Sequence, residues 1–144
     1  MSIPVQRVQR TMKQSVSVLW PCAVLGLASA ASAQTMVSGN ISGTWSPSGN
    51  PYVVTDNATV PAGQTLTIQP GVTVWIAENV SITANGLIQA VGTPTQRITF
   101  QAPIASQYWS NIYCLHASGT NRFKYCDFRN ADTPGISAKA ESQP

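Results

Sequence analysis

The sequence predicts an all-β fold built as a parallel β-helix, a coil of short strands in which each turn, or rung, stacks on the one before. Two observations predict it. Runs of three to five residues with alternating apolar positions are separated by Gly, Pro or Asn at almost every gap, as in TVPAGQTLTIQPGVTVWI, residues 59–76. Similar elements then recur after 20 to 25 residues, as from Leu66 to Leu87 and from Val74 to Ile98. A period of this length is typical of solenoids, whose repeats bury their apolar sides only by stacking.

The first element in the sequence is a predicted secretory signal peptide, residues 1–33. Basic residues precede an apolar run over 16–28, and small residues lead to an expected cleavage after Ala33. An uncleaved anchor is the weaker alternative, because the run is shorter than the ~20 residues that span a bilayer and contains Pro21. We therefore expect an exported protein, in the periplasm, at the cell surface or in the medium, without a membrane span in its mature chain.

The charge of the mature chain is balanced once the signal is removed. Three of the eight basic residues lie within 1–33, which leaves five basic and five acidic residues. No basic stripe remains, so the sequence excludes nucleic acid as a partner. The abundance of Thr, Ser, Asn, Gly and Val is typical of β-rich extracellular proteins.

The remaining elements are an irregular lead-in or cap over 34–51, rich in Gly, Ser, Asn and Pro, and about five short rungs over 52–144. Nine strands are predicted, at 52–54, 58–60, 66–68, 72–76, 80–82, 87–91, 97–100, 111–115 and 125–128. Alternating apolar residues from Ile136 to Ala140 indicate that a further strand begins shortly before the sequence ends. Because an open end leaves strand edges unpaired, we expect a β-helix that is truncated at its C-terminus, as in a fragment of a longer protein. A β-sandwich is the alternative fold, but its strands are longer and joined by hairpins.

Two elements carry a family resemblance: VPAGQTLTIQPGV, residues 60–72, and GLIQAVGT, residues 86–93. The sequence over about 41–136 resembles the N-terminal region of secreted bacterial right-handed parallel β-helix proteins, the pectin-lyase-like superfamily. The resemblance implies a right-handed coil. It leaves the activity open, because this fold is shared by lyases, hydrolases, adhesins and structural stalks.

In the enzymes of that superfamily, acidic residues on the outer face of one sheet bind calcium or act as acid and base, and Arg or Lys abstracts a proton. The few carboxylates of the mature chain are spread out and show no such motif. His116 has no Ser, Cys or Asp partner at a recognisable spacing. We therefore predict no catalytic residue, metal site or cofactor in this chain. The alternative is an N-terminal fragment of a polysaccharide lyase or glycoside hydrolase whose catalytic rungs lie beyond residue 144.

Candidate binding residues follow from the alternation of the strands. Inward Val74 and Ile76 would place Trp75 on the outside, and Tyr113 would point outward in the same way. Flat aromatic rings on a rigid sheet can stack on sugar rings, although they can equally pack under the lead-in segment around Trp45. Trp109 is expected to pack at a corner.

A polar pair near the end of the chain adds to these candidates. If Cys126 and Phe128 point inward, Asp127 and Arg129 point outward side by side. They are either part of a polysaccharide-binding face or a solvated pair of little energetic value. Cys126 and Cys114 either form a disulfide, which an oxidising compartment would permit, or lie apart as core residues.

These observations favour an exported, non-catalytic β-helix module with a structural or adhesive role. Its expected partner is extracellular polysaccharide or the cell envelope. A protein-binding surface adhesin or stalk is the remaining alternative.

Overall fold

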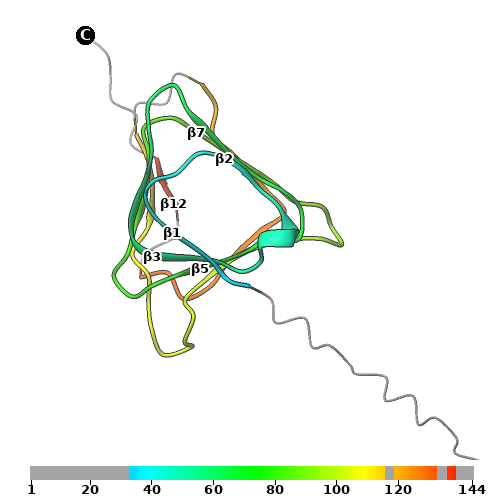
Figure 1. Cartoon of the computed structure of the whole chain (residues 1–144), viewed down its shortest axis with the longest axis vertical. Helices are drawn as coiled ribbons and strands as arrows, with labels where there is room; N and C mark the ends of the chain where they lie inside the picture. The colour runs from blue at the N-terminus through cyan, green and yellow to red at the C-terminus, as the bar shows by residue number, and fades with distance from the viewer. Residues whose placement is uncertain (1–32, 116–118, 133–135, 139–144) are drawn as a thin grey trace, which may run out of the picture. The chain divides into compact units, whose positions relative to one another are not determined.

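The computed structural model describes residues 33–115, 119–132 and 136–138, and these residues form a parallel β-helix with a triangular cross-section (Figure 1). The predicted signal segment and His116 lie outside the described residues, apart from Ala33. Among the described residues, no helix is long and apolar enough to cross a membrane.

Three faces make up the triangle, and every strand pair on them is parallel. Face 1 holds the first half of β3 (Tyr52–Val60) with β5 (Thr73–Ile76), β8 (Ile98–Gln101) and β11 (Cys126–Phe128). Face 2 holds the second half of β3 with β6 (Ile82–Ala84), β9 (Ile112–Cys114) and β12 (Ile136–Ala138). Face 3 holds β2 (Gly43–Trp45), β4 (Thr65–Ile68), β7 (Leu87–Val91) and β10 (Arg122–Lys124). The first strand, β1 (Thr35–Asn40), pairs with both halves of β3.

The strands follow the chain around the triangle in five rungs. Rung 1 contains β1 and β2, rung 2 contains β3 and β4, and rungs 3 and 4 contain β5–β7 and β8–β10. In rung 5 the described residues contribute β11 and β12. The predicted all-β solenoid is therefore confirmed.

The register differs from the spacings that revealed the repeat. Leu66 pairs with Ile88 rather than with Leu87, and Val74 pairs with Phe100 rather than with Ile98. A shift of one residue turns a side chain from the inside of the coil to the outside, so burial decides between Leu87 and Ile88. Ile88 is 1% exposed, whereas Leu87 is only half-buried. Ile98 and Phe100 are two residues apart and both buried, so burial alone does not choose between them.

Residues 34–51, predicted as an irregular lead-in, contain the two strands of rung 1 and a short 3-10 helix, Pro47–Gly49. Gly39 and Gly43 have φ angles of +64° and +85°, which glycine adopts without strain, and this allows the chain to bend at and after β1. The small polar residues of this segment gave no apolar alternation. Its strands form because rung 2 offers them a paired edge.

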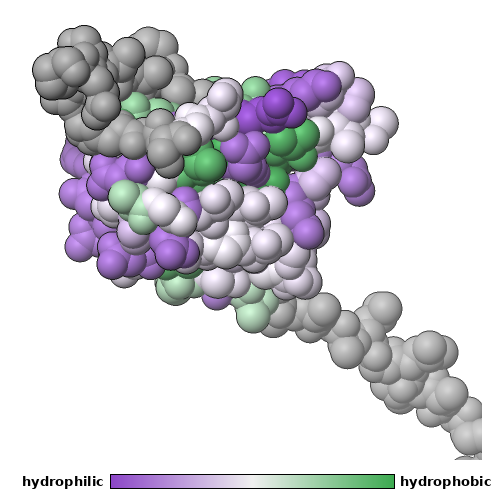
Figure 2. All heavy atoms as spheres, turned by 90° about the horizontal axis from the view of Figure 1, so that it is seen from above, coloured by the Kyte–Doolittle hydropathy of each residue, from purple (hydrophilic) through white to green (hydrophobic). Residues whose placement is uncertain are grey.

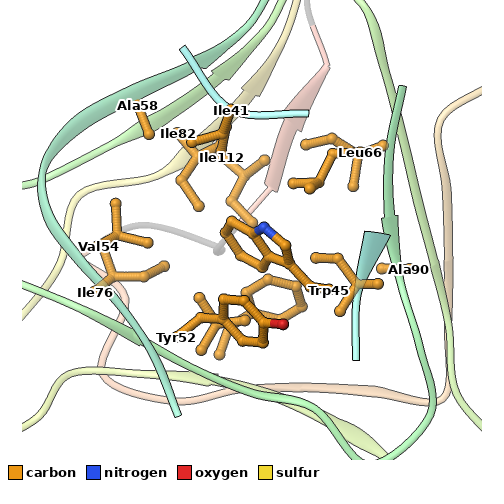
Figure 3. Packing of buried hydrophobic residues seen from close by; sticks show 14 of the residues in the cluster. Ile41, Trp45, Tyr52, Val54, Ala58, Leu66, Ile76, Ile82, Ala90 and Ile112 are labelled. Atoms are coloured by element: carbon orange, nitrogen blue, oxygen red, sulfur yellow. The ribbon is translucent and has the colours of Figure 1, made fainter. Parts of the chain in front are cut away.

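The interior of the coil is filled by apolar side chains from all three faces (Figure 3). Val72, Val74 and Ile76 are completely buried, as their spacing predicted. Near the first rung, the rings of Trp45 and Tyr52 stack with their centroids 4.6 Å apart and an angle of 8° between their planes. Fully burying an aliphatic side chain such as Val72 or Ile76 contributes about 1.5–3 kcal/mol, which makes the stacked core the main source of stability.

The outer surface is correspondingly polar. On the side shown in Figure 2, most described residues are hydrophilic or of intermediate hydropathy, and hydrophobic residues are few. This distribution is expected where alternate residues of each strand point away from the core.

Candidate functional site

The outer surface of face 1 carries an ordered column of side chains, one from each rung. The strand register aligns Met36, Val53, Trp75 and Gln101 in this column. Arg129 follows directly after β11, and its backbone N–H donates to the carbonyl oxygen of Phe100 at 2.9 Å, which places it next to Gln101. Because parallel strands lie about 4.8 Å apart, the column repeats at that interval along the axis of the coil.

A second column lies beside the first and consists of Thr73, Thr99 and Asp127. Two predicted site residues, Trp75 and Asp127, therefore occupy neighbouring columns of one face. Together with Arg129, they present an aromatic ring, a carboxylate and a guanidinium group on one rigid sheet. The sequence placed Asp127 beside Arg129 on the outside but gave no information on whether Trp75 shares their face.

Asp127 has a partner that the sequence did not predict. Arg97, from the preceding rung, binds its carboxylate through two nitrogens: Nη2 lies 2.7 Å from Oδ1, and Nε lies 2.9 Å from each oxygen. The hydrogen bonds from Arg97 hold the pKa of Asp127 below its usual value, and the charge of Arg129 lowers this pKa further as a lesser effect. Arg129 is exposed and lies next to this ion pair.

Trp75 lies on the outer surface as its alternation predicted, and its side chain is half-buried. Its neighbour Val53 also points outward but is only 9% exposed. The surface around Trp75 is therefore apolar, and little of Val53 reaches solvent. The indole Nε1 is buried and has no hydrogen-bond partner among the described residues. In this position Trp75 can contribute ring stacking to a ligand but no hydrogen bond.

Tyr113 lies on a different face from the other candidates. It aligns with Thr59 and Thr83 on the outside of face 2 and is 37% exposed. The corner between faces 1 and 2 separates it from Trp75. Tyr113 and Trp75 therefore do not form one flat aromatic platform.

The loop between β8 and β9, residues 102–111, contains two exposed apolar residues that the sequence analysis missed. Ile104 is 55% exposed and Tyr108 is 54% exposed. The loop projects from the corner between faces 1 and 2, where it is drawn in yellow (Figure 1). Trp109, which follows Tyr108 in the same loop, is completely buried, and this confirms the predicted corner packing. The signal in the sequence was the long gap between the strands 97–100 and 111–115.

Cys114 and Cys126 are free thiols on different faces. Cys114 is buried at the end of β9, whereas Cys126 is half-buried at the start of β11. The Sγ atom of Cys126 lies 3.4 Å from the carbonyl oxygen of Ala90. Burial raises the pKa of Cys126 to about 11, so its thiol is protonated at neutral pH.

The carboxylates that could perform chemistry remain dispersed. In the part of the chain that the structure describes, no three His, Cys, Asp or Glu residues gather closely enough to hold a metal ion. Asp127, the one predicted site residue with a carboxylate, is engaged by Arg97. The arrangement on face 1 is therefore suited to binding through stacking, hydrogen bonds and charge.

Comparison with known proteins gives one partial similarity. Over 53 residues, 37% of its length, the chain is 46% identical to Protein bark beetle of Drosophila melanogaster. The chain spans about 2% of the length of that relative. No protein family profile matches the sequence. No solved structure matches it either.

Proposed function

We propose that this chain is an exported, non-catalytic β-helix module that binds extracellular polysaccharide or the polysaccharide of a cell envelope. The predicted signal peptide and the balanced charge of the mature chain support export and a partner other than nucleic acid. The binding surface is the outside of face 1. The module serves a structural or adhesive role by presenting this surface on a stiff coil.

The observation that carries the proposal is the alignment of Trp75, Gln101 and Arg129 in one outward column. An aromatic ring offers apolar area for the face of a sugar ring. The amide and the guanidinium group offer hydrogen bonds to its hydroxyl or carboxylate groups. A polysaccharide is a chain of repeated units, and a column repeated at the strand spacing of about 4.8 Å offers it successive contacts.

Rigidity adds to the suitability of this face. Strands of face 1 are paired with the rungs above and below from β3 to β8, so the side chains of the column stand on a backbone that is already ordered. A preordered surface loses less conformational entropy on binding, which leaves more of the contact energy for affinity.

The proposal is tested by measuring binding of the mature chain to xylan, mannan, β-glucan, alginate and polygalacturonate by affinity electrophoresis and calorimetry. We expect the wild-type chain to bind at least one of them and Trp75→Ala to weaken that binding about tenfold, because an aromatic stacking contact contributes about 0.5–1.5 kcal/mol beyond the apolar area it buries. Tyr113→Ala is the matched control, since it removes an exposed ring from face 2. Equal losses in the two variants, or no binding by the wild-type chain, would contradict the proposal.

A further inference from the structure

The loop over residues 102–111 exposes two large apolar side chains although its backbone is firmly held. Ile104 and Tyr108 each present more than half of their surface to solvent. An exposed apolar side chain adds little to the stability of the fold, and loops held on a rigid scaffold often carry binding residues.

Two asparagines clamp the loop from the rungs on either side. Asn79 of rung 3 donates its backbone N–H to the carbonyl oxygen of Tyr108 at 3.1 Å. Asn130 of rung 5 donates its side-chain Nδ2 to the carbonyl oxygen of Ala105 at 2.9 Å. Both asparagines have left-handed backbones, with φ angles of +60° and +58°, a conformation that asparagine tolerates better than most residues.

Trp109 anchors the end of the loop in the core. Its indole Nε1 donates to the carbonyl oxygen of Arg129 at 2.7 Å, and its backbone N–H donates to the carbonyl oxygen of Asn130 at 3.0 Å. Within the loop, Gln107 donates its backbone N–H to the carbonyl oxygen of Ile104 at 3.0 Å. Tyr108 therefore stands between a completely buried neighbour and a hydrogen-bonded turn.

The loop also borders the proposed binding face. It leaves face 1 directly after Gln101, which lies between Trp75 and Arg129 in the outward column. Its anchor, Trp109, bonds to the backbone of Arg129 in the same column. The backbone that carries the exposed side chains is thus held next to the column by direct hydrogen bonds.

We propose that Tyr108 is a second aromatic contact for the polysaccharide, held in position by Asn79 and Asn130. The ring stacks on a sugar unit at the edge of face 1. This inference rests on the proposed function of face 1. A glycan fits these observations better than a protein partner because the loop adjoins the column in which an aromatic ring, an amide and a guanidinium group follow one another on successive rungs. Because hydrogen bonds to Asn79 and Asn130 order the loop before binding, the loop loses less conformational entropy when the glycan binds.

The test uses the full mature chain and whichever polysaccharide of the panel the wild-type chain binds. Tyr108→Ala is expected to weaken binding about tenfold, whereas Tyr108→Phe keeps the ring and retains most of the affinity. Asn130→Gly keeps the left-handed backbone but removes the bond to Ala105. It is expected to weaken binding several-fold and to speed amide hydrogen exchange in residues 104–108, while Tyr113→Ala changes neither.

The outcomes separate this inference from the proposed function. If Trp75→Ala weakens binding but Tyr108→Ala binds like the wild-type chain, the role of the loop in glycan binding is overturned and the proposed function stands. The exposed side chains of the loop would then be assigned to binding a protein partner. Normal glycan affinity in Asn130→Gly together with faster exchange would overturn the positioning role. Absence of binding by the wild-type chain would overturn the proposed function and this inference together.

Discussion

Gly86 provides a sharp test of how closely the rungs are stacked. It precedes β7 at the corner between faces 2 and 3, and its backbone N–H donates to the carbonyl oxygen of Val60 at 3.0 Å. A Cβ atom at this position would overlap the backbone carbonyl oxygens of Pro61 and Gln64 in the rung below. Because both neighbours are backbone atoms, no rotation of a side chain relieves the overlap. Gly86→Ala must therefore move rung 3 away from rung 2 at this corner.

The expected cost has two parts. Overpacking by one methyl group costs about 1–3 kcal/mol, and weakening a backbone hydrogen bond adds about 1 kcal/mol. A total near 3 kcal/mol lowers the Tm of a domain of this size by roughly 12–24 °C. In urea, where small proteins have m-values of about 1–3 kcal/mol per molar, the midpoint moves down by about 1 M or more.

The measurement is urea unfolding of the mature chain, followed by circular dichroism and by tryptophan fluorescence. Gly63→Ala is the control, because Gly63 has a φ angle of +76° but open space around the added methyl group. Its cost is the backbone strain alone, about 1–2 kcal/mol. If Gly86→Ala were no more destabilising than Gly63→Ala, the close approach of the two rungs would be refuted.

Two further predictions concern titrating groups. Because Arg97 lowers the pKa of Asp127 in the folded chain, the pair stabilises the fold at pH values above the unfolded pKa of about 3.9, and this stability is lost as the pH falls through the lowered folded pKa. Asp127→Asn should therefore flatten the acid side of the curve of unfolding free energy against pH, and an unchanged curve would contradict the pairing. For Cys126, a pKa of about 11 leaves on the order of one thiolate per thousand molecules at pH 8, so iodoacetamide should label it slowly in the folded chain and rapidly in urea. If Cys126 takes up no label even when the chain is unfolded in urea without a reductant, it is instead bound to Cys114 in a disulfide.

Strand positions and the core were largely predictable from local pattern. The alternation in residues 72–76 correctly placed Val74 inside and Trp75 outside, because each residue of a strand points opposite to its neighbours. The same argument failed for β10, residues 122–124. Two of its three residues are charged and exposed, and Phe123 alone faces the core, so no apolar alternation marks it.

The partners of outward side chains were much less predictable, because they come from different rungs. Ala58 pairs with Ile82, 24 residues later, whereas Ile82 pairs with Ile112, 30 residues later. Apolar alternation shows which residues of a strand point inward, but it does not show how many residues the connecting loops contain. The spacing between paired strands therefore cannot be obtained from it. For this reason the sequence placed Asp127 beside Arg129 but could not identify Arg97, 30 positions earlier, as the residue that binds it.

The longer spacing in rung 4 bears on function as well as on register. The shorter rungs show that the coil closes with about 22 to 24 residues, so the additional residues of loop 102–111 are not needed to connect face 1 to face 2. Fixing the backbone of each residue costs about 1–2 kcal/mol of conformational entropy. Burial of Trp109 offsets part of this cost, but Ile104 and Tyr108 bury little surface and offset little of it. A loop that is ordered by bonds to two other rungs, and that keeps its apolar side chains in solvent, is better explained by a binding role than by the stability of the coil.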